Sequence, residues 1–123
     1  MLFRSLEVEV VGQPESNPVP ELAQSIAASA SEVFKRPLGR TWVRLHILPV
    51  DQYAEDGGVP EGVLPVFVRV SIRDEPGRDT LRYLAERLAK LIGAASGRPP
   101  ENVHVIFEPA MTGRIAFGGK LLE

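Results

Sequence analysis

The sequence predicts an α+β fold in which two helices cover one face of a four-stranded sheet. Three observations lead to this prediction. Four segments show the alternation or the short apolar runs that are typical of strands, and two longer segments repeat apolar residues at helical spacing. The order of these segments is β-α-β-β-α-β. The 123 residues suit one domain with one core, which we expect to span residues 1–123.

The first half of the chain contains two predicted strands and one helix. Leu6–Val11 alternates apolar and polar residues, as a strand with one buried face does. A connector with three prolines follows, and a helix is predicted over Pro20–Phe34 because proline suits the first helical turn. Its apolar stripe consists of Leu22, Ile26, Ala30 and Val33. Trp42–Leu48 is the second predicted strand.

The second half begins after a long polar segment that contains several glycines. Val66–Ile72 is predicted to be the third strand. The second helix is predicted to begin at Asp79, a residue type that caps helices, and to end at Gly97, which a proline pair follows. Val103–Glu108 is the fourth predicted strand.

The two halves are similar to each other at an offset of about 60 residues. VRLHILP at Val43–Pro49 matches VHVIFEP at Val103–Pro109, and a KRP or GRP triplet precedes each of the two strands. One interpretation is a tandem repeat of β-α-β units, at about 1–50 and 63–109, followed by a tail at 110–123. The other is the general likeness of any two β-α-β units of this size.

Alternation along the strands predicts a sheet with two unlike faces. The face that we expect beneath the helices is apolar throughout: Leu6, Val8, Val10, Val43, Leu45, Ile47, Val66, Val68, Val70, Ile72, Val103, Val105 and Phe107. The other face carries charged residues of both signs, including Glu7, Arg44 and Arg69. It is either the solvated outer face of a two-layer domain, or a face that meets another subunit and pairs its opposite charges.

The chain ends in an apolar tail that contains a glycine pair. The apolar residues of the tail are Ile115, Phe117, Leu121 and Leu122. Because the helix-covered face is already filled, we expect the tail to pack on a neighbouring subunit. Gly118 and Gly119 would then allow two backbones to approach closely.

Two stretches resemble the tautomerase superfamily, which includes 4-oxalocrotonate tautomerase and macrophage migration inhibitory factor. ENVHVIFEPAMTGRIAFGGKL, at Glu101–Leu121, resembles the end of those chains, with a strand, a short loop and a glycine pair. LPVDQYAEDGG, at Leu48–Gly58, resembles the segment after the second strand in inhibitory-factor-like members. The order and length of the elements fit over essentially the whole chain. The resemblance implies two fused β-α-β units, a homotrimer, a tail that pairs with an adjacent subunit, and active sites between subunits near the start of the first strand.

The resemblance also implies a reaction, proton transfer on a small carboxylate-bearing keto or enol substrate without a cofactor. Family members typically use an N-terminal proline as the acid or base, but this sequence begins MLFRS and its first proline is Pro14. Three functions therefore stay open. The protein is a tautomerase-like isomerase whose activity is weak or lost, a non-catalytic trimer that binds a ligand or protein, or a ferredoxin-like module outside the superfamily, which strand pairing would distinguish.

Five residues are candidates for the site. The amine of Met1 and the imidazole of His104 belong to types of group that exchange protons near neutral pH, so both are candidate catalytic groups. Arg36 and Arg114 lie where the resemblance implies substrate-binding cations, and Phe117 lies between Arg114 and the glycine pair.

Each candidate also has a structural interpretation. Met1 would be a frayed terminus, His104 would pair with a glutamate, Arg36 and Arg114 would be solvated cations, and Phe117 would pack in the tail.

Composition excludes or disfavours several further kinds of site and partner. The chain has no cysteine, which excludes disulfides and thiolate chemistry, and it has only two histidines, so we expect no metal. A formal net charge of −2 and the lack of a basic run predict no nucleic-acid partner. No stretch is apolar enough to cross a membrane, and we expect a cytoplasmic protein.

Overall fold

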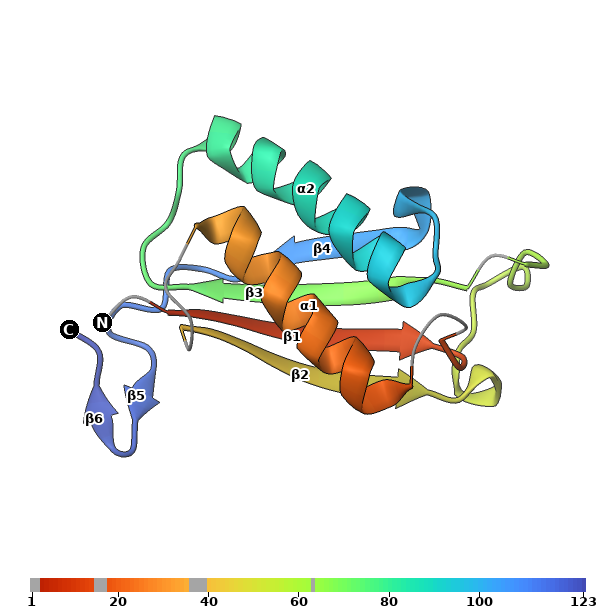
Figure 1. Cartoon of the computed structure of the whole chain (residues 1–123), viewed down its shortest axis with the longest axis horizontal. Coiled ribbons are helices and arrows are strands. Elements are labelled where there is room, and N and C mark those ends of the chain that lie inside the picture. The colour runs from red at the N-terminus through yellow and green to blue at the C-terminus, as the bar shows by residue number, and fades with distance from the viewer. Residues whose placement is uncertain (1–2, 15–17, 36–39, 63) are drawn as a thin grey trace.

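The computed structural model describes residues 3–14, 18–35, 40–62 and 64–123. It has two layers, with α1 (Val19–Phe34) and α2 (Arg78–Ser96) lying across one face of a sheet (Figure 1). The sheet consists of β1 (Arg4–Val11), β2 (Thr41–Leu48), β3 (Val66–Ile72) and β4 (Val103–Phe107). The predicted α+β fold and its order of elements are therefore confirmed.

The strands lie in the order β2-β1-β3-β4. β1 is parallel to β2, β3 is parallel to β4, and the two pairs meet through the antiparallel ladder between β1 and β3. Each β-α-β unit thus joins two strands that are parallel neighbours. This is the pairing that distinguishes the tautomerase arrangement, so the ferredoxin-like alternative is wrong.

The strand register relates the two halves by an offset of 60 residues. Leu6 pairs with Val43 between β1 and β2, and the same relation recurs between Val66 and Val103 in β3 and β4. The central antiparallel ladder keeps this relation, because it joins the first strand of each half. The sheet therefore has an approximate two-fold axis, and each end of β1 has an equivalent at an end of β3.

The apolar face of the sheet lies beneath the helices, as predicted, and forms the core. Apolar residues from both helices complete it. The buried core residues are Leu6, Val8, Val10, Leu22, Ile26, Ala30, Val33, Phe34, Val66, Val68, Val70, Ile72, Leu84, Leu88, Ile92 and Val103. Burial of this apolar surface is the main favourable term that holds the two layers together.

Several element boundaries differ from the prediction by one or two residues, and two of these differences affect the argument. α2 has Gly77 at its N-cap, so Asp79 is not the cap; it lies in the first turn, where its carboxylate accepts a hydrogen bond of 2.8 Å from Arg82 Nη1. β1 begins at Arg4 instead of Leu6. Since side chains alternate along a strand, this extension adds an arginine to the row of core-facing residues.

The tail forms a small hairpin of β5 (Ala116–Phe117) and β6 (Lys120–Leu121). Gly118 and Gly119 make its turn, with φ of 58° and 90°, and a Cβ on either would meet no atom within 4 Å. The glycines serve the left-handed backbone of the turn. The expected close approach to a neighbouring subunit stays a prediction. Figure 1 shows the hairpin beside the start of β1.

Candidate functional site

A cavity of about 410 Å³ opens at the end of the sheet where β1 begins. The end of α1, the end of β3, the loop after β3 and the first turns of α2 surround it. Its lining residues are Arg4, Val33, Phe34, Lys35, Ile72, Arg73, Asp74, Glu75, Pro76, Thr80, Tyr83 and Leu84. The cavity therefore combines apolar walls with three cations and two carboxylates.

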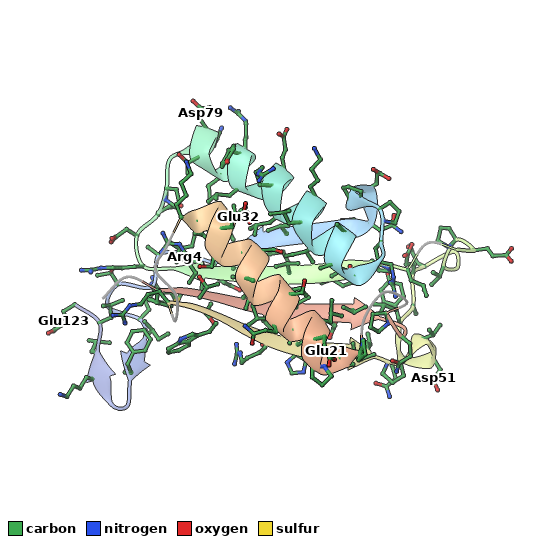
Figure 2. All side chains as sticks on the ribbon, in the orientation of Figure 1. Arg4, Glu21, Glu32, Asp51, Asp79 and Glu123 are labelled. Carbon is green, nitrogen blue, oxygen red and sulfur yellow. The ribbon has the colours of Figure 1, made fainter. Side chains whose placement is uncertain are left out.

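Arg4 is the buried cation of this cavity, with 7% of its surface exposed. Its guanidinium carbon lies 4.9 Å from the centre of the Phe34 ring, within the range of a cation–π contact. Its Nη1 donates a hydrogen bond of 2.7 Å to the carbonyl oxygen of Phe3. Figure 2 shows Arg4 at the same end of the molecule as Glu32 and Asp79, near the ends of both helices. Arg4 is thus fixed by both an aromatic face and the backbone.

The other charged groups of the cavity lie nearer to solvent. Lys35 is exposed and ends α1 in a left-handed conformation, with φ of 52°. Arg73 lies 3.6 Å from the Asp74 carboxylate and donates a hydrogen bond of 3.4 Å to the backbone oxygen of Glu123. The Thr112 hydroxyl lies 3.2 Å from Asp74 Oδ1. The loop after β3 is therefore held by the tail.

The far end of the sheet is built differently. The offset of 60 makes Leu64 and Gln13 the equivalents of Arg4 and Arg73. There the buried Arg98 donates hydrogen bonds to the carbonyl oxygens of Leu64, at 2.9 Å, and of Gln13, at 3.3 Å. A structural side chain occupies this end of the pseudo-symmetric sheet, whereas the equivalent end carries the cavity.

His104 lies far from the cavity within one chain. It stands on β4 in the same cross-strand row as Phe67 and Glu9. Glu9 is five residues along β1 from Arg4, which corresponds to about 17 Å of strand. Within a single protomer, His104 is therefore distant from the start of β1.

The remaining predicted residues have different positions. Met1 and Arg36 lie outside the described residues. Arg114 is exposed in the loop before β5 and does not line the cavity. Phe117 is half-buried and packs edge-on against Phe3, at 5.0 Å between ring centroids, in a cluster with a tryptophan of β2. Within this chain Phe117 therefore joins the tail to the start of β1.

The outer face of the sheet carries paired charges, and it also carries aromatic rings. Glu7 lies 3.2 Å from Arg44, and Arg69 Nη1 donates a bond of 2.6 Å to Glu108. The hydrogen bond and the negative charge of Glu108 raise the pKa of Arg69. The opposite charges thus pair with each other on this face, which is compatible with both interpretations of the sequence.

The Phe67 ring lies between two polar rings on this outer face. Its centroid is 5.6 Å from His104 and 6.1 Å from Tyr53. The Tyr53 hydroxyl donates a hydrogen bond of 2.6 Å to Glu55, and this bond raises the pKa of Tyr53 above its usual 10.0. His104 is exposed beside these rings. It does not line the cavity that contains Arg4.

Sequence reasoning missed all the charged residues of the cavity, and Arg4 is the one for which the sequence held a signal. The available signal was its parity, because Arg4 alternates with Leu6, Val8 and Val10 on the core-facing side of β1. A charged residue in an apolar row is unusual, since burial of a charge is costly.

No group of three histidine or acidic side chains in the described ranges is placed to hold a metal ion. Neither helix of the described chain is long and apolar enough to span a membrane.

Comparison with solved structures shows that this is the fold of the tautomerase superfamily. A fused 4-oxalocrotonate tautomerase, described as a symmetric trimer, superposes with a TM-score of 0.76 at 16% identity, over 96% of this chain and 94% of that chain. Macrophage migration inhibitory factor of Toxoplasma gondii gives a TM-score of 0.67 at 15% identity, over 95% and 98%. A member of the cis-3-chloroacrylic acid dehalogenase family gives 0.71 at 19% identity, over 97% and 83%.

No protein-family model matches the sequence, and no curated protein is significantly similar to it. The likeness is therefore one of fold. Since a fold supports several reactions, the function has to be argued from the cavity.

Proposed function

We propose that this chain is a tautomerase-like isomerase that moves a proton on a small carboxylate-bearing keto or enol compound. The observation that carries the proposal is the cavity at the start of β1, where Arg4, Lys35 and Arg73 provide positive charge beside apolar walls. The superfamily resemblance implies an active site at this same end of the sheet. A carboxylate on a small organic molecule is the ligand that such a lining favours.

Proton transfer requires a group that can hold and return a proton next to the bound substrate. Among the described lining residues, Asp74 and Glu75 are carboxylates that can do so. The N-terminal amine of Met1 is a further candidate for the group that transfers the proton.

His104 joins the same site only if another protomer supplies it, because about 17 Å of strand separate its row from Arg4 within one chain. A homotrimer would allow this. Support for a trimer comes from the fused 4-oxalocrotonate tautomerase, which is described as one.

The second candidate is a non-catalytic trimer that binds a ligand or a partner protein in the same cavity. One observation favours it. Both carboxylates of the cavity are exposed, and Asp74 is already engaged by Arg73 and Thr112. A general base is usually more shielded than this, and its proton affinity is tuned by burial.

Ketonisation of phenylpyruvate enol, followed by ultraviolet absorbance, separates the two candidates. An isomerase accelerates the reaction above a heat-inactivated control, and Glu75→Gln or His104→Ala lowers kcat. Arg82→Gln, which removes a cation from the exposed side of α2, serves as the matched control. A trimer that binds the compound without any acceleration would refute the isomerase and support the binding protein.

A further inference from the structure

We infer that the outer face of the sheet binds a small organic ammonium ion through Glu9 and the aromatic side chains beside it. This face is the one that α1 and α2 leave uncovered (Figure 1). The inferred ligand is a cation, whereas the proposed function concerns an anion at the start of β1. The inference therefore goes beyond the isomerase activity and does not depend on turnover.

A cavity of about 360 Å³ lies on this outer face and extends from β1 across β3 to β4. Its volume falls within the range of about 300–1,000 Å³ that is typical of small-molecule sites. The side chains that line it include Glu7, Glu9, Tyr53, Phe67, Arg69 and Ile106. The cavity thus combines carboxylates with aromatic and aliphatic walls.

Glu9 supplies the unbalanced charge of this cavity in the described part of the chain. The other two charges of the lining are balanced, since Glu7 lies 3.2 Å from Arg44 and Arg69 lies 2.6 Å from a glutamate of the same face. Within the described ranges, the Glu9 carboxylate accepts no hydrogen bond and forms no ion pair, although Glu9 is half-buried. Burial of a carboxylate without a partner is costly, so a bound cation would be favourable there.

The approximate two-fold axis of the sheet explains why Glu9 has no ion pair among the described residues. The offset of 60 residues makes Arg69 the equivalent of Glu9. It also makes Glu108, which pairs with Arg69, the equivalent of the apolar Leu48. The neighbour of Glu9 on β2 is His46, and no ion pair joins the two within the described structure. A ligand can therefore supply to Glu9 the opposite charge that Glu108 supplies to Arg69.

Aromatic rings lie next to Glu9 on the side of β3. Phe67 is its cross-strand neighbour there. The centroid of the Phe67 ring lies 6.1 Å from that of Tyr53 and 5.6 Å from that of His104. An ammonium ion is attracted to the face of an aromatic ring as well as to a carboxylate. Since the exposed Ile106 adds an aliphatic wall, the ligand class is a primary ammonium on a small aromatic or branched apolar body.

Binding of 2-phenylethylammonium and of its neutral analogue, 2-phenylethanol, tests the inference by isothermal titration calorimetry, on the protein in the assembly that it forms in solution. We expect the wild type to bind the ammonium at least about fivefold more tightly than the alcohol, because a half-buried carboxylate should exceed the effect of an exposed ion pair. Glu9→Gln should remove this preference and leave the affinity for the alcohol within about threefold. Phe67→Leu should weaken ammonium binding by about two- to fivefold, the usual effect of one cation–π contact at an exposed site.

Methyl NMR locates the bound ammonium. Ile106 lines the cavity of the outer face, and Ile72 lines the cavity at the start of β1. The methyl signals of Ile106 should shift on titration, while those of Ile72 stay in place. Retained binding of the alcohol reports an intact cavity in Glu9→Gln. Glu86→Gln, which removes an exposed carboxylate from α2, is the matched control and should leave both affinities unchanged.

Four results would overturn the inference. They are equal wild-type affinities for the two compounds, a Glu9→Gln variant that keeps the preference for the ammonium, a wild type that binds neither compound, and a shift of Ile72 without one of Ile106. The last result would place the cation at the start of β1. Ketonisation activity enters none of these measurements, so a failure of this inference is distinguishable from a failure of the proposed function.

Discussion

Replacement of Arg98 by methionine should destabilise the fold far more than replacement of an exposed arginine. Arg98 follows α2 and donates three hydrogen bonds to backbone carbonyls: to Val11 at 3.0 Å, to Leu64 at 2.9 Å and to Gln13 at 3.3 Å. These bonds tie the end of β1 to the segment before β3. Arg98→Met keeps most of the aliphatic stem and removes all three donors.

The magnitude follows from the number and kind of these bonds. A hydrogen bond to a charged group contributes about 1.5–3 kcal/mol, and removal of the donor leaves the buried Val11 carbonyl unsatisfied. Neighbouring contributions are not additive, and some carbonyls regain water, so we expect a loss of about 3 kcal/mol in the free energy of unfolding. With a urea m-value of about 1.5 kcal/mol/M, the midpoint should fall by about 2 M.

Urea unfolding followed by circular dichroism measures this change. Arg82→Met is the matched control, because its ion pair with Asp79 is exposed and such pairs contribute little. Midpoints that shift by the same small amount in both variants would refute the reasoning that Arg98 holds this end of the sheet.

Three further predictions concern other positions. Gly93→Ala should lower the free energy of unfolding by about 1–3 kcal/mol, because a Cβ there would lie 2.6 Å from a backbone carbonyl oxygen in the following loop. Gly77→Ala is the control, because a Cβ at that position meets no atom within 4 Å. Equal free energies of unfolding for the two variants would contradict this prediction. Phe117→Ala should speed proteolysis of the tail, since the ring packs on the start of β1, while unchanged cleavage would show that the hairpin is held elsewhere. Glu55→Gln should lower the pKa of Tyr53 toward 10.0, because the substitution weakens the hydrogen bond and removes the negative charge that favour the protonated phenol. A titration followed by the NMR shifts of the Tyr53 ring measures this pKa. An unchanged pKa would contradict the assigned hydrogen bond.

The fold was predictable because its signals are local. Alternation in segments such as Leu6–Val11 and helical spacing in α1 and α2 define which face of each element is buried. The superfamily resemblance then supplied the parallel pairing of the two strands within each β-α-β unit, which composition alone does not contain.

The tail was only partly predictable. A glycine pair between apolar residues is compatible with the left-handed turn that Gly118 and Gly119 form, but the packing of the tail on a neighbouring subunit stays a prediction.

The cavity was not predictable in the same way. Its charged residues come from the start of β1, the end of α1 and the end of β3, which are distant in the sequence. Arg4 became a candidate only because β1 begins two residues earlier than expected. His104 and Arg114 were both candidates because they lie in the stretch that resembles the end of the superfamily chains, yet His104 stands near the beginning of β4 and Arg114 comes after its end.

The hydrogen bonds of Arg98 have a consequence for stoichiometry. A sheet with an approximate two-fold axis offers two equivalent ends, and a fully symmetric chain would carry a ligand at each. Here Arg98 is committed to the carbonyls of Leu64 and Gln13 at one end, and Arg4 lines the cavity at the other. We therefore expect titrations to saturate at one ligand per chain, so that a trimer of this protein would take up three.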